Sequence, residues 1–236
     1  MVTVDFDRLS LEPGFKILDI GCGSGRHTSA AYQCRNATVI GVDLNYDDLK
    51  DASNRMYLHD RLGEHGGGTW ALSAADILSL PFQDDHFDLV ICSEVLEHIV
   101  VHTAAIREIV RVLKPGNNLV VSVPRYWPER LCWILSPSYA GGTGGHVRIF
   151  KQQQLISDLA SAGLNLWSRH FAHSLHTPFW WLKCLVGPDR ENSPPVKMYH
   201  RFLTWDIMQK PRVTGMLDKL LNPVMGKSVV LYLNKI

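Results

Sequence analysis

Short apolar segments that alternate with helix-like segments are the feature of the first 124 residues that most restricts their fold. Five of these segments are rich in β-branched or other apolar residues, and they cover 15–20, 37–42, 69–74, 87–92 and 119–123. The segments between them have helical patterns over 26–36, about 47–64 and 102–113. Strands that alternate with helices predict βαβ units, and therefore an α/β fold whose mostly parallel sheet carries helices on both faces.

The alternation stops near Pro124, and the composition changes at the same place. Nine of the 12 prolines and six of the seven tryptophans lie from this residue onward. The formal charge also divides, from −7 over residues 1–123 to +6 over residues 164–236, although the whole chain has a net charge of only +1. We expect an irregular, aromatic-rich C-terminal elaboration, with helices at about 152–162, 196–208 and 213–221 and a final strand at about 228–233.

A glycine-rich loop, Gly-Cys-Gly-Ser-Gly at residues 21–25, follows the first predicted strand. Glycines between a strand and a helix let a ligand approach the backbone near the unpaired N–H groups of the helix N-terminus. The dinucleotide fingerprint Gly-x-Gly-x-x-Gly is not matched, because Arg26 occupies the place of its third glycine. Asp19 stands just before the loop, and a carboxylate there suits a ligand with a cationic end better than one with a pyrophosphate.

Two further aspartates follow predicted strands. Asp43 ends the second strand and can accept two hydrogen bonds from a ribose diol, while Asp76 follows the third and can bind an exocyclic amine. Because open α/β sheets bind ligands outside the carboxyl ends of their strands, we expect both aspartates and Asp19 to line one crevice.

Five blocks in this order resemble the motifs of class I S-adenosylmethionine-dependent methyltransferases. They lie in the segments LDIGCGSGRHT, GVDLN, AADILSLPFQDDHFDLVICSEVLEHI and EIVRVLKPGNNLVVSVP, and the resemblance covers residues 13–124. It implies methyl transfer by a Rossmann-like, seven-stranded sheet with a reversed last hairpin. We expect a single domain over 1–236, made of a cofactor-binding core (13–124), an acceptor-binding insertion or lid (125–227) and a final strand (228–236).

The same resemblance implies which residues hold S-adenosylmethionine. The methionine part would lie against Asp19 and the glycine loop, the ribose against Asp43, the adenine edge against Asp76 and Ile77, and the sulfonium near Ser93. The expected cofactor-binding residues are Asp19, Gly21, Cys22, Gly23, Gly25, Asp43, Leu44, Asp76, Ile77 and Ser93.

A carboxylate–histidine group follows the fourth predicted strand. Glu94, Glu97 and His98 lie within five residues, and His146 ends a glycine-rich segment further on. Two carboxylates and imidazoles can bind a divalent metal such as Mg²⁺, which would activate a bound hydroxyl. The pattern resembles the small-RNA 2′-O-methyltransferases and the ubiquinone-pathway O-methyltransferases, which bind a metal there. The alternatives are a metal-free catalytic role for His98 or His146 and a purely structural one.

These residues favour a small-molecule acceptor that is methylated on a hydroxyl oxygen, and we expect a sugar, a lipid or a polyketide-like compound. Methylation of nitrogen or carbon is the alternative. A nicotinamide-dependent oxidoreductase is disfavoured by the glycine spacing and Asp19. A non-catalytic module that only binds the cofactor is disfavoured by the intact SEVLEHI segment.

The second half holds two more groups of interest. His170, His173 and His176 would share one face if their segment were helical, and we expect them in a substrate pocket or a packed loop. The block 179–186 contains Trp180 and Trp181 and can form core, a wall of the acceptor pocket, or a peripheral membrane contact. A pI of about 7.7 without a dense basic cluster argues against nucleic acid as a partner.

The chain lacks the sequence signs of secretion. Its first residues show no basic patch followed by an apolar stretch, and no run approaches the roughly 18 apolar residues that span a bilayer. Its five cysteines are scattered and form no Cys-x-x-Cys pair, which argues against a disulfide framework and a structural zinc site. We therefore expect a cytoplasmic protein. The sequence does not indicate whether the chain forms an oligomer.

Overall fold

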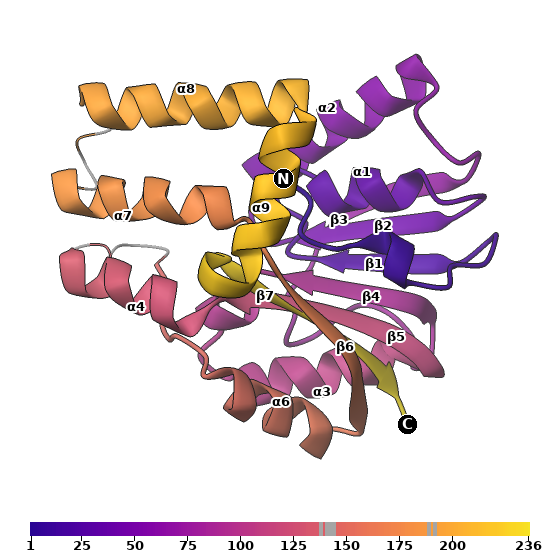
Figure 1. The fold of residues 1–236 in the computed structure, drawn as a ribbon. Coiled ribbons are helices and arrows are strands. Elements are labelled where there is room, and N and C mark those ends of the chain that lie inside the picture. Colours follow the sequence, from indigo (N-terminus) through magenta and orange to yellow (C-terminus); the bar gives the residue numbers. More distant parts are fainter. Residues whose placement is uncertain (137–138, 140–144, 188–189, 191–192) are drawn as a thin grey trace.

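A seven-stranded sheet forms the centre of the molecule (Figure 1). The computed structural model describes residues 1–136, 139, 145–187, 190 and 193–236. The strand order is β3-β2-β1-β4-β5-β7-β6. Among the described strands, β7 runs antiparallel to both β5 and β6, and the other neighbouring pairs are parallel. The strands are β1 (Lys16–Ile20), β2 (Thr38–Asp43), β3 (Thr69–Ala74), β4 (Phe87–Ser93), β5 (Leu113–Pro124), β6 (Leu164–Ala172) and β7 (Ser228–Lys235). The expected α/β fold with a reversed last hairpin is thus confirmed.

Helices cover both faces of the sheet, as the alternating pattern predicted. On one face, the core is formed with α1 (Arg26–Tyr32), α2 (Tyr46–Leu62) and the N-terminal segment that contains η1 (Phe6–Arg8). On the other, α3 (His102–Val112) and α6 (Gln152–Ser161) supply the buried side chains. The central strands β1 and β4 read as continuous apolar runs because both of their faces are buried.

The C-terminal elaboration is more regular than its proline-rich sequence indicated. It consists mainly of α4 (Tyr126–Leu135), α7 (Thr177–Val186), α8 (Pro194–Gln209) and α9 (Arg212–Met225). Figure 1 shows α4, α7 and α8 stacked beyond one end of the sheet, with α9 crossing in front. The helix α4 follows β5, and α7, α8 and α9 lie between β6 and β7 in the chain. We call these four helices the cap. The cap lies at the carboxyl ends of the parallel strands.

Two local expectations need correction. The helix α3 ends at Val112 and β5 already begins at Leu113, so this strand starts six residues before the expected 119–123. His170 lies on the strand β6, which excludes the shared helical face considered for the three histidines. Among the described residues, no helix combines the length and the apolar character needed to cross a bilayer.

Candidate functional site

The glycine loop turns the chain sharply between β1 and α1. Gly21, Gly23 and Gly25 all have positive φ angles, of 65°, 49° and 76°, which glycine adopts without steric cost. A Cβ atom on Gly25 would lie only 3.0 Å from the side chain of Ala52. One on Gly23 would meet nothing within 4 Å, so the loop backbone is open at this point. The loop therefore packs tightly against α2 and leaves space for a ligand on its other side.

Asp19 lies beside this loop and is buried, with 1% of its surface exposed. Its Oδ2 atom accepts a 2.6 Å hydrogen bond from Thr28 Oγ1, while Oδ1 has no hydrogen-bond partner among the described residues. Burial raises the pKa of Asp19 to about 7, although the Thr28 hydrogen bond opposes the shift. A buried carboxylate with a free oxygen is suited to a cationic ligand group.

Asp43 shapes the loop as well as the crevice. Its Oδ2 atom accepts a 2.8 Å hydrogen bond from the Gly23 N–H, and its Oδ1 atom accepts a 2.9 Å bond from the Asn45 N–H. Leu44 follows and is 68% exposed, unusually open for a large apolar residue next to a buried strand. The Asp43 carboxylate is thus fixed against the glycine loop, and an exposed apolar side chain follows it.

Asp76 and Ile77 follow β3 but differ in exposure. Asp76 is exposed, and its Oδ1 atom accepts a 2.9 Å hydrogen bond from the Leu78 N–H. Ile77 is buried in the core, so only its backbone and the edge of its side chain remain for a ligand. Cys22 is also buried, and its contribution to the crevice is its position within the loop rather than its thiol.

A chain of hydroxyl and carboxylate groups ends β4 and β5. Ser93 Oγ lies 2.8 Å from Ser122 Oγ, which donates a 3.0 Å hydrogen bond to Glu94 Oε1. Glu94 has a φ of 58°, a conformation that is uncommon for residues other than glycine. This backbone turn directs the Glu94 carboxylate to Ser122, outside the group formed by Glu97, His98 and His146.

Those three residues lie together at the edge of the cap. One ligand atom from each of Glu97, His98 and His146 lies within 4.8 Å of the other two. The rings of His98 and His146 meet edge to face with centroids 4.9 Å apart, and His98 Nδ1 donates to the Gly145 carbonyl at 3.3 Å. Three of the four residues predicted for a metal site are therefore neighbours.

Glu97 is nearly inaccessible, and both of its carboxylate oxygens lack a hydrogen-bond partner within the described part of the chain. Its Oε1 atom lies 3.9 Å from His146 Nε2. Burial and the nearby charge of Glu94 raise the pKa of Glu97 well above its ordinary value. Such a carboxyl group is either protonated or paired with a cation.

Glu129 completes this group and was missed in the sequence. It is buried on α4, and its Oε1 atom accepts a 2.7 Å hydrogen bond from His146 Nδ1. Burial acts to raise the pKa of Glu129, but the hydrogen bond and charge of His146 outweigh it and lower that pKa. Its only sequence signal was one acid in the aromatic segment YWPERLCW, which identifies no partner.

The aromatic block of α7 forms part of the cap's interior. Trp181 donates from Nε1 to the Pro128 carbonyl at 3.1 Å, which links α7 to α4. Trp180 packs against Tyr139, with ring centroids 5.9 Å apart, and Tyr139 in turn lies 6.5 Å from the His146 ring. Both tryptophans are half-buried and contact other parts of the cap, and the pocket-wall interpretation stays a prediction.

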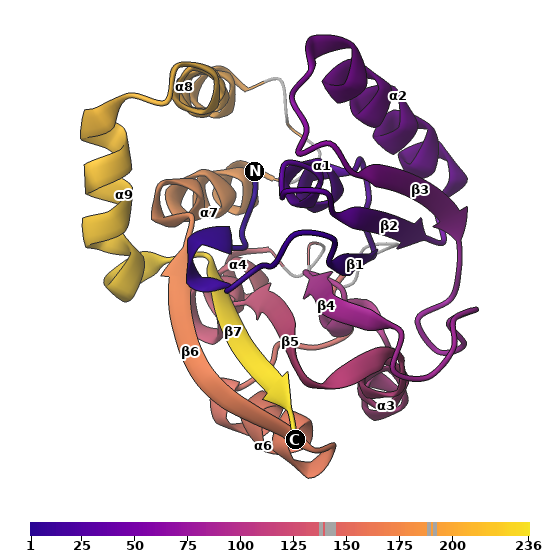
Figure 2. The same cartoon turned by 90° about the vertical axis from the view of Figure 1, so that its right-hand side faces the viewer.

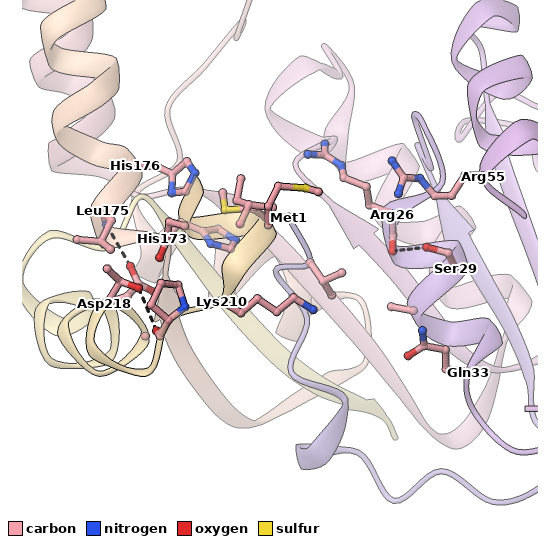
Figure 3. A pocket seen from close by; sticks show the side chains of 18 of the residues that line it. Met1, Arg26, Ser29, Gln33, Arg55, His173, Leu175, His176, Lys210 and Asp218 are labelled. Carbon is pink, nitrogen blue, oxygen red and sulfur yellow. Dashed lines mark hydrogen bonds between the residues drawn. The ribbon is translucent and has the colours of Figure 1, made fainter. Parts of the chain in front are cut away.

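A separate cavity of about 790 Å³ lies between α1 and α2 on one side and the cap on the other. Figure 3 shows Arg26 and Arg55 on one wall and His173 and His176 opposite. Arg55 also donates from Nε to the Ser24 carbonyl at 2.8 Å, so this wall is continuous with the glycine loop. The described residues that line this cavity do not include Glu97, His98, Glu129 or His146.

The sequence of residues 11–163 matches the family model described as "Methyltransferase domain". The methyltransferase GfsG of Streptomyces halstedii is 32% identical over 120 residues, which are 50% of this chain and 40% of that protein. The 27-O-demethylrifamycin SV methyltransferase of Amycolatopsis mediterranei is 31% identical over 136 residues, or 56% of this chain and 44% of that protein. The chain thus spans less than half the length of either relative.

The fold is similar to the crystal structure of a SAM-dependent methyltransferase from Methanosarcina mazei. The TM-score is 0.65 at 17% sequence identity, and the match covers 100% of this chain and 99% of that one. The strand order, the glycine loop and the family match lead to the same assignment. The chain belongs to the class I S-adenosylmethionine-dependent methyltransferase family.

Proposed function

We propose that the chain transfers a methyl group from S-adenosylmethionine to a hydroxyl oxygen of a small-molecule acceptor. The observation that carries this proposal is the 2.7 Å hydrogen bond between the buried Glu129 carboxylate and His146 Nδ1. A hydroxyl must lose its proton as it is methylated, whereas a neutral amine already has a free lone pair. A histidine held by a carboxylate is suited to that proton transfer. The relative named 27-O-demethylrifamycin SV methyltransferase supports an oxygen acceptor.

The crevice residues fit the cofactor by their chemistry. Asp19 would face the cationic methionine end, the backbone of residues 21–25 would lie along it, and Asp43 with Leu44 would contact the ribose side. Asp76 and Ile77 would flank the adenine, and Ser93 would lie near the sulfonium. S-adenosylmethionine supplies the methyl group on its sulfonium sulfur, and these residues orient it and exclude water.

The Glu129–His146 pair would act as the base. Because His146 donates its Nδ1 proton to Glu129, its Nε2 atom carries the lone pair that accepts the acceptor's hydroxyl proton. The Glu129 carboxylate stabilises the imidazolium that results. The acceptor oxygen, freed of its proton, would take the methyl group, and S-adenosylhomocysteine would leave. Trp180 and Tyr139 would provide an apolar wall for the acceptor.

A metal-assisted reaction is the second candidate, and one observation favours it. The two unpaired oxygens of buried Glu97, together with His98 and His146, form a carboxylate–imidazole set. Imidazole-containing sets of this kind suit Mn²⁺, Fe²⁺ or Zn²⁺ better than Mg²⁺. A metal held there would lower the pKa of a bound hydroxyl, and Glu129 would orient His146 from behind.

Release of S-adenosylhomocysteine, measured over a panel of hydroxylated acceptors, tests both candidates. His146→Ala should lower kcat by roughly 10²-fold or more while the Kd for S-adenosylmethionine stays within about twofold. Glu129→Gln should lower kcat by roughly tenfold, because the imidazolium loses its carboxylate. His86→Ala, at the other end of β4, is the matched control and should leave both constants unchanged.

Chelator separates the two candidates. Under the base mechanism, activity survives exhaustive treatment with EDTA. Activity that EDTA abolishes and Mn²⁺ restores would assign the metal-assisted reaction instead. Full turnover by His146→Ala would overturn both, and failure of the chain to bind S-adenosylmethionine would overturn the proposal as a whole.

A further inference from the structure

The helix α9 is attached to the molecule by its polar side and presents its apolar side to solvent. Its large apolar residues recur at helical spacing, and none of its residues is buried. The exposed fractions are 77% for Val213, 72% for Met216, 43% for Leu217, 74% for Leu220 and 66% for Val224. We call these five residues the α9 face. Soluble proteins usually bury such a stripe, so its exposure needs an explanation.

Hydrogen bonds hold the opposite side of α9 against the core. Asp218 Oδ1 accepts bonds from Ser174 Oγ at 2.8 Å and from the Leu175 N–H at 3.1 Å. Asn222 Oδ1 accepts a 2.9 Å bond from the Ser174 N–H. These contacts fix the rotation of the helix, so the α9 face cannot turn inward without breaking them. Figure 2 shows α9 at the outer edge of the molecule.

The helices α8 and α9 together carry a positive charge. Residues 194–225 contain five lysine or arginine residues and two aspartates, a formal net charge of +3. One of the aspartates, Asp218, is the residue bonded to Ser174. Arg212 and Lys219 lie on α9 itself. An exposed apolar stripe bordered by basic residues is the pattern of helices that lie in the interface of an anionic membrane.

A second copy of the chain is a poorer fit to this surface. A 14-residue helix is about 21 Å long, and with a width of roughly 10 Å its face covers roughly 200 Å². Stable dimers bury about 800 Å² on each partner. Symmetric pairing would also bring two positively charged surfaces together, which is unfavourable.

We propose that the α9 face docks the protein onto an anionic lipid surface. The apolar side chains of α9 enter the boundary between headgroups and acyl chains, while Arg212 and Lys219 contact lipid phosphates. This places the cap, rather than the acidic first half of the chain, against the membrane. The surface is distinct from the Trp180–Trp181 block, whose rings pack within the cap. The proposal does not depend on which acceptor atom is methylated.

Cosedimentation with phosphatidylglycerol–phosphatidylcholine vesicles tests the proposal. The chain should bind these vesicles, bind pure phosphatidylcholine vesicles at least about tenfold more weakly, and dissociate as salt is raised. The double variant Met216→Glu/Leu220→Glu should lose binding by at least about tenfold, because two charges would enter the apolar boundary. Leu58→Glu/Leu62→Glu, which changes two exposed leucines of α2, is the matched control and should bind like the wild type.

Circular dichroism and S-adenosylmethionine titration establish that both double variants are folded. Equal vesicle binding by wild type and Met216→Glu/Leu220→Glu would overturn the proposal, as would the absence of binding by the wild type. A concentration-dependent dimer in light scattering that this double variant abolishes would assign the face to a second copy instead. Loss of vesicle binding with unchanged S-adenosylhomocysteine release on soluble acceptors would separate this proposal from the proposed reaction.

Discussion

Asp19 is a buried carboxylate without an ion-pair partner among the described residues. Its one hydrogen bond comes from Thr28, and the charge of Asp43 adds to the cost of ionising it. The fold accepts this cost at the place where a cationic ligand would remove it. The ionised Asp19 carboxylate is therefore better accommodated when a cationic ligand is bound than in the free protein.

Replacing Asp19 by asparagine tests the stability cost of the ionised carboxylate in the free protein separately from its contribution to ligand binding. Because burial raises the pKa of Asp19 from near 3.8 to about 7, the folded chain binds more protons than the unfolded chain between these values. The contribution of Asp19 to the free energy of unfolding therefore falls as pH rises from about 4 to about 7 and stays low above pH 7. Asp19→Asn should raise the free energy of unfolding at pH 8 by roughly 2 kcal/mol and change it little at pH 4.

The same variant should bind S-adenosylmethionine about tenfold more weakly at pH 8, because the cationic end loses a charged partner. Wild-type affinity should fall as pH drops below about 7, and the affinity of Asp19→Asn should not. Urea unfolding and calorimetric titration at several pH values measure both effects. Asp51→Asn, exposed on α2, serves as the control. An Asp19→Asn variant that is less stable than the wild type at pH 8 would contradict the argument.

At the scale of elements, Arg111 of α3 holds the connection between β3 and β4. Its NH1 group donates to the Phe82 carbonyl and to Asp84, both at 2.7 Å, and its NH2 group donates to the Leu80 carbonyl at 3.0 Å. Glu108, one turn earlier on α3, accepts from the same guanidinium at 2.7 Å. One planar side chain thus fixes a loop that begins with Asp76, the residue proposed to face the adenine.

Arg111→Ala should therefore affect stability and cofactor binding together. We expect the free energy of unfolding to fall by about 2 kcal/mol, and the Kd for S-adenosylmethionine to rise by roughly fivefold as the loop loosens. Arg111→Lys keeps the charge but not the fork and should be intermediate. Arg107→Ala on the exposed side of α3 is the control, measured by the same urea and calorimetric experiments. Equal effects at both positions would argue against a loop-specific role.

The elements that the sequence predicted well are those whose pattern is local. The strands β1, β2 and β4 are apolar runs followed by polar residues, so their positions and the place of Asp19 and Asp43 were readable. The strand β6 escaped prediction because, as an edge strand, it alternates exposed and partly buried residues and contains polar side chains. The partnership of Glu129 with His146 depends on how α4 packs, and no spacing rule contains that information.

At the scale of the whole molecule, the last strand and the N-terminal segment are joined. Tyr232 on β7 is fully buried, and its hydroxyl accepts a 2.8 Å hydrogen bond from the Asp5 N–H. The same segment bonds to α1, where the Thr3 N–H donates to His27 Nε2 at 2.9 Å. The N-terminal segment thereby covers one face of the sheet, where Val4 and Val230 are part of the same hydrophobic core.

Tyr232→Phe tests how much this closure contributes. The substitution keeps the ring but leaves the Asp5 N–H without its partner, so the free energy of unfolding should fall by about 1 kcal/mol. Burial raises the pKa of Tyr232 to about 12, so the hydroxyl stays protonated, and the loss should be the same at pH 6 and pH 9. Urea unfolding at both values measures it, and Tyr57→Phe, with an exposed ring, should cost less than half as much. Amide hydrogen exchange should speed up at residues 3–9 before it does at β7, because the N-terminal segment loses its anchor while β7 keeps both of its neighbouring strands. Exchange that rises first in β7 would show that the hydroxyl supports the sheet itself rather than the segment that covers it.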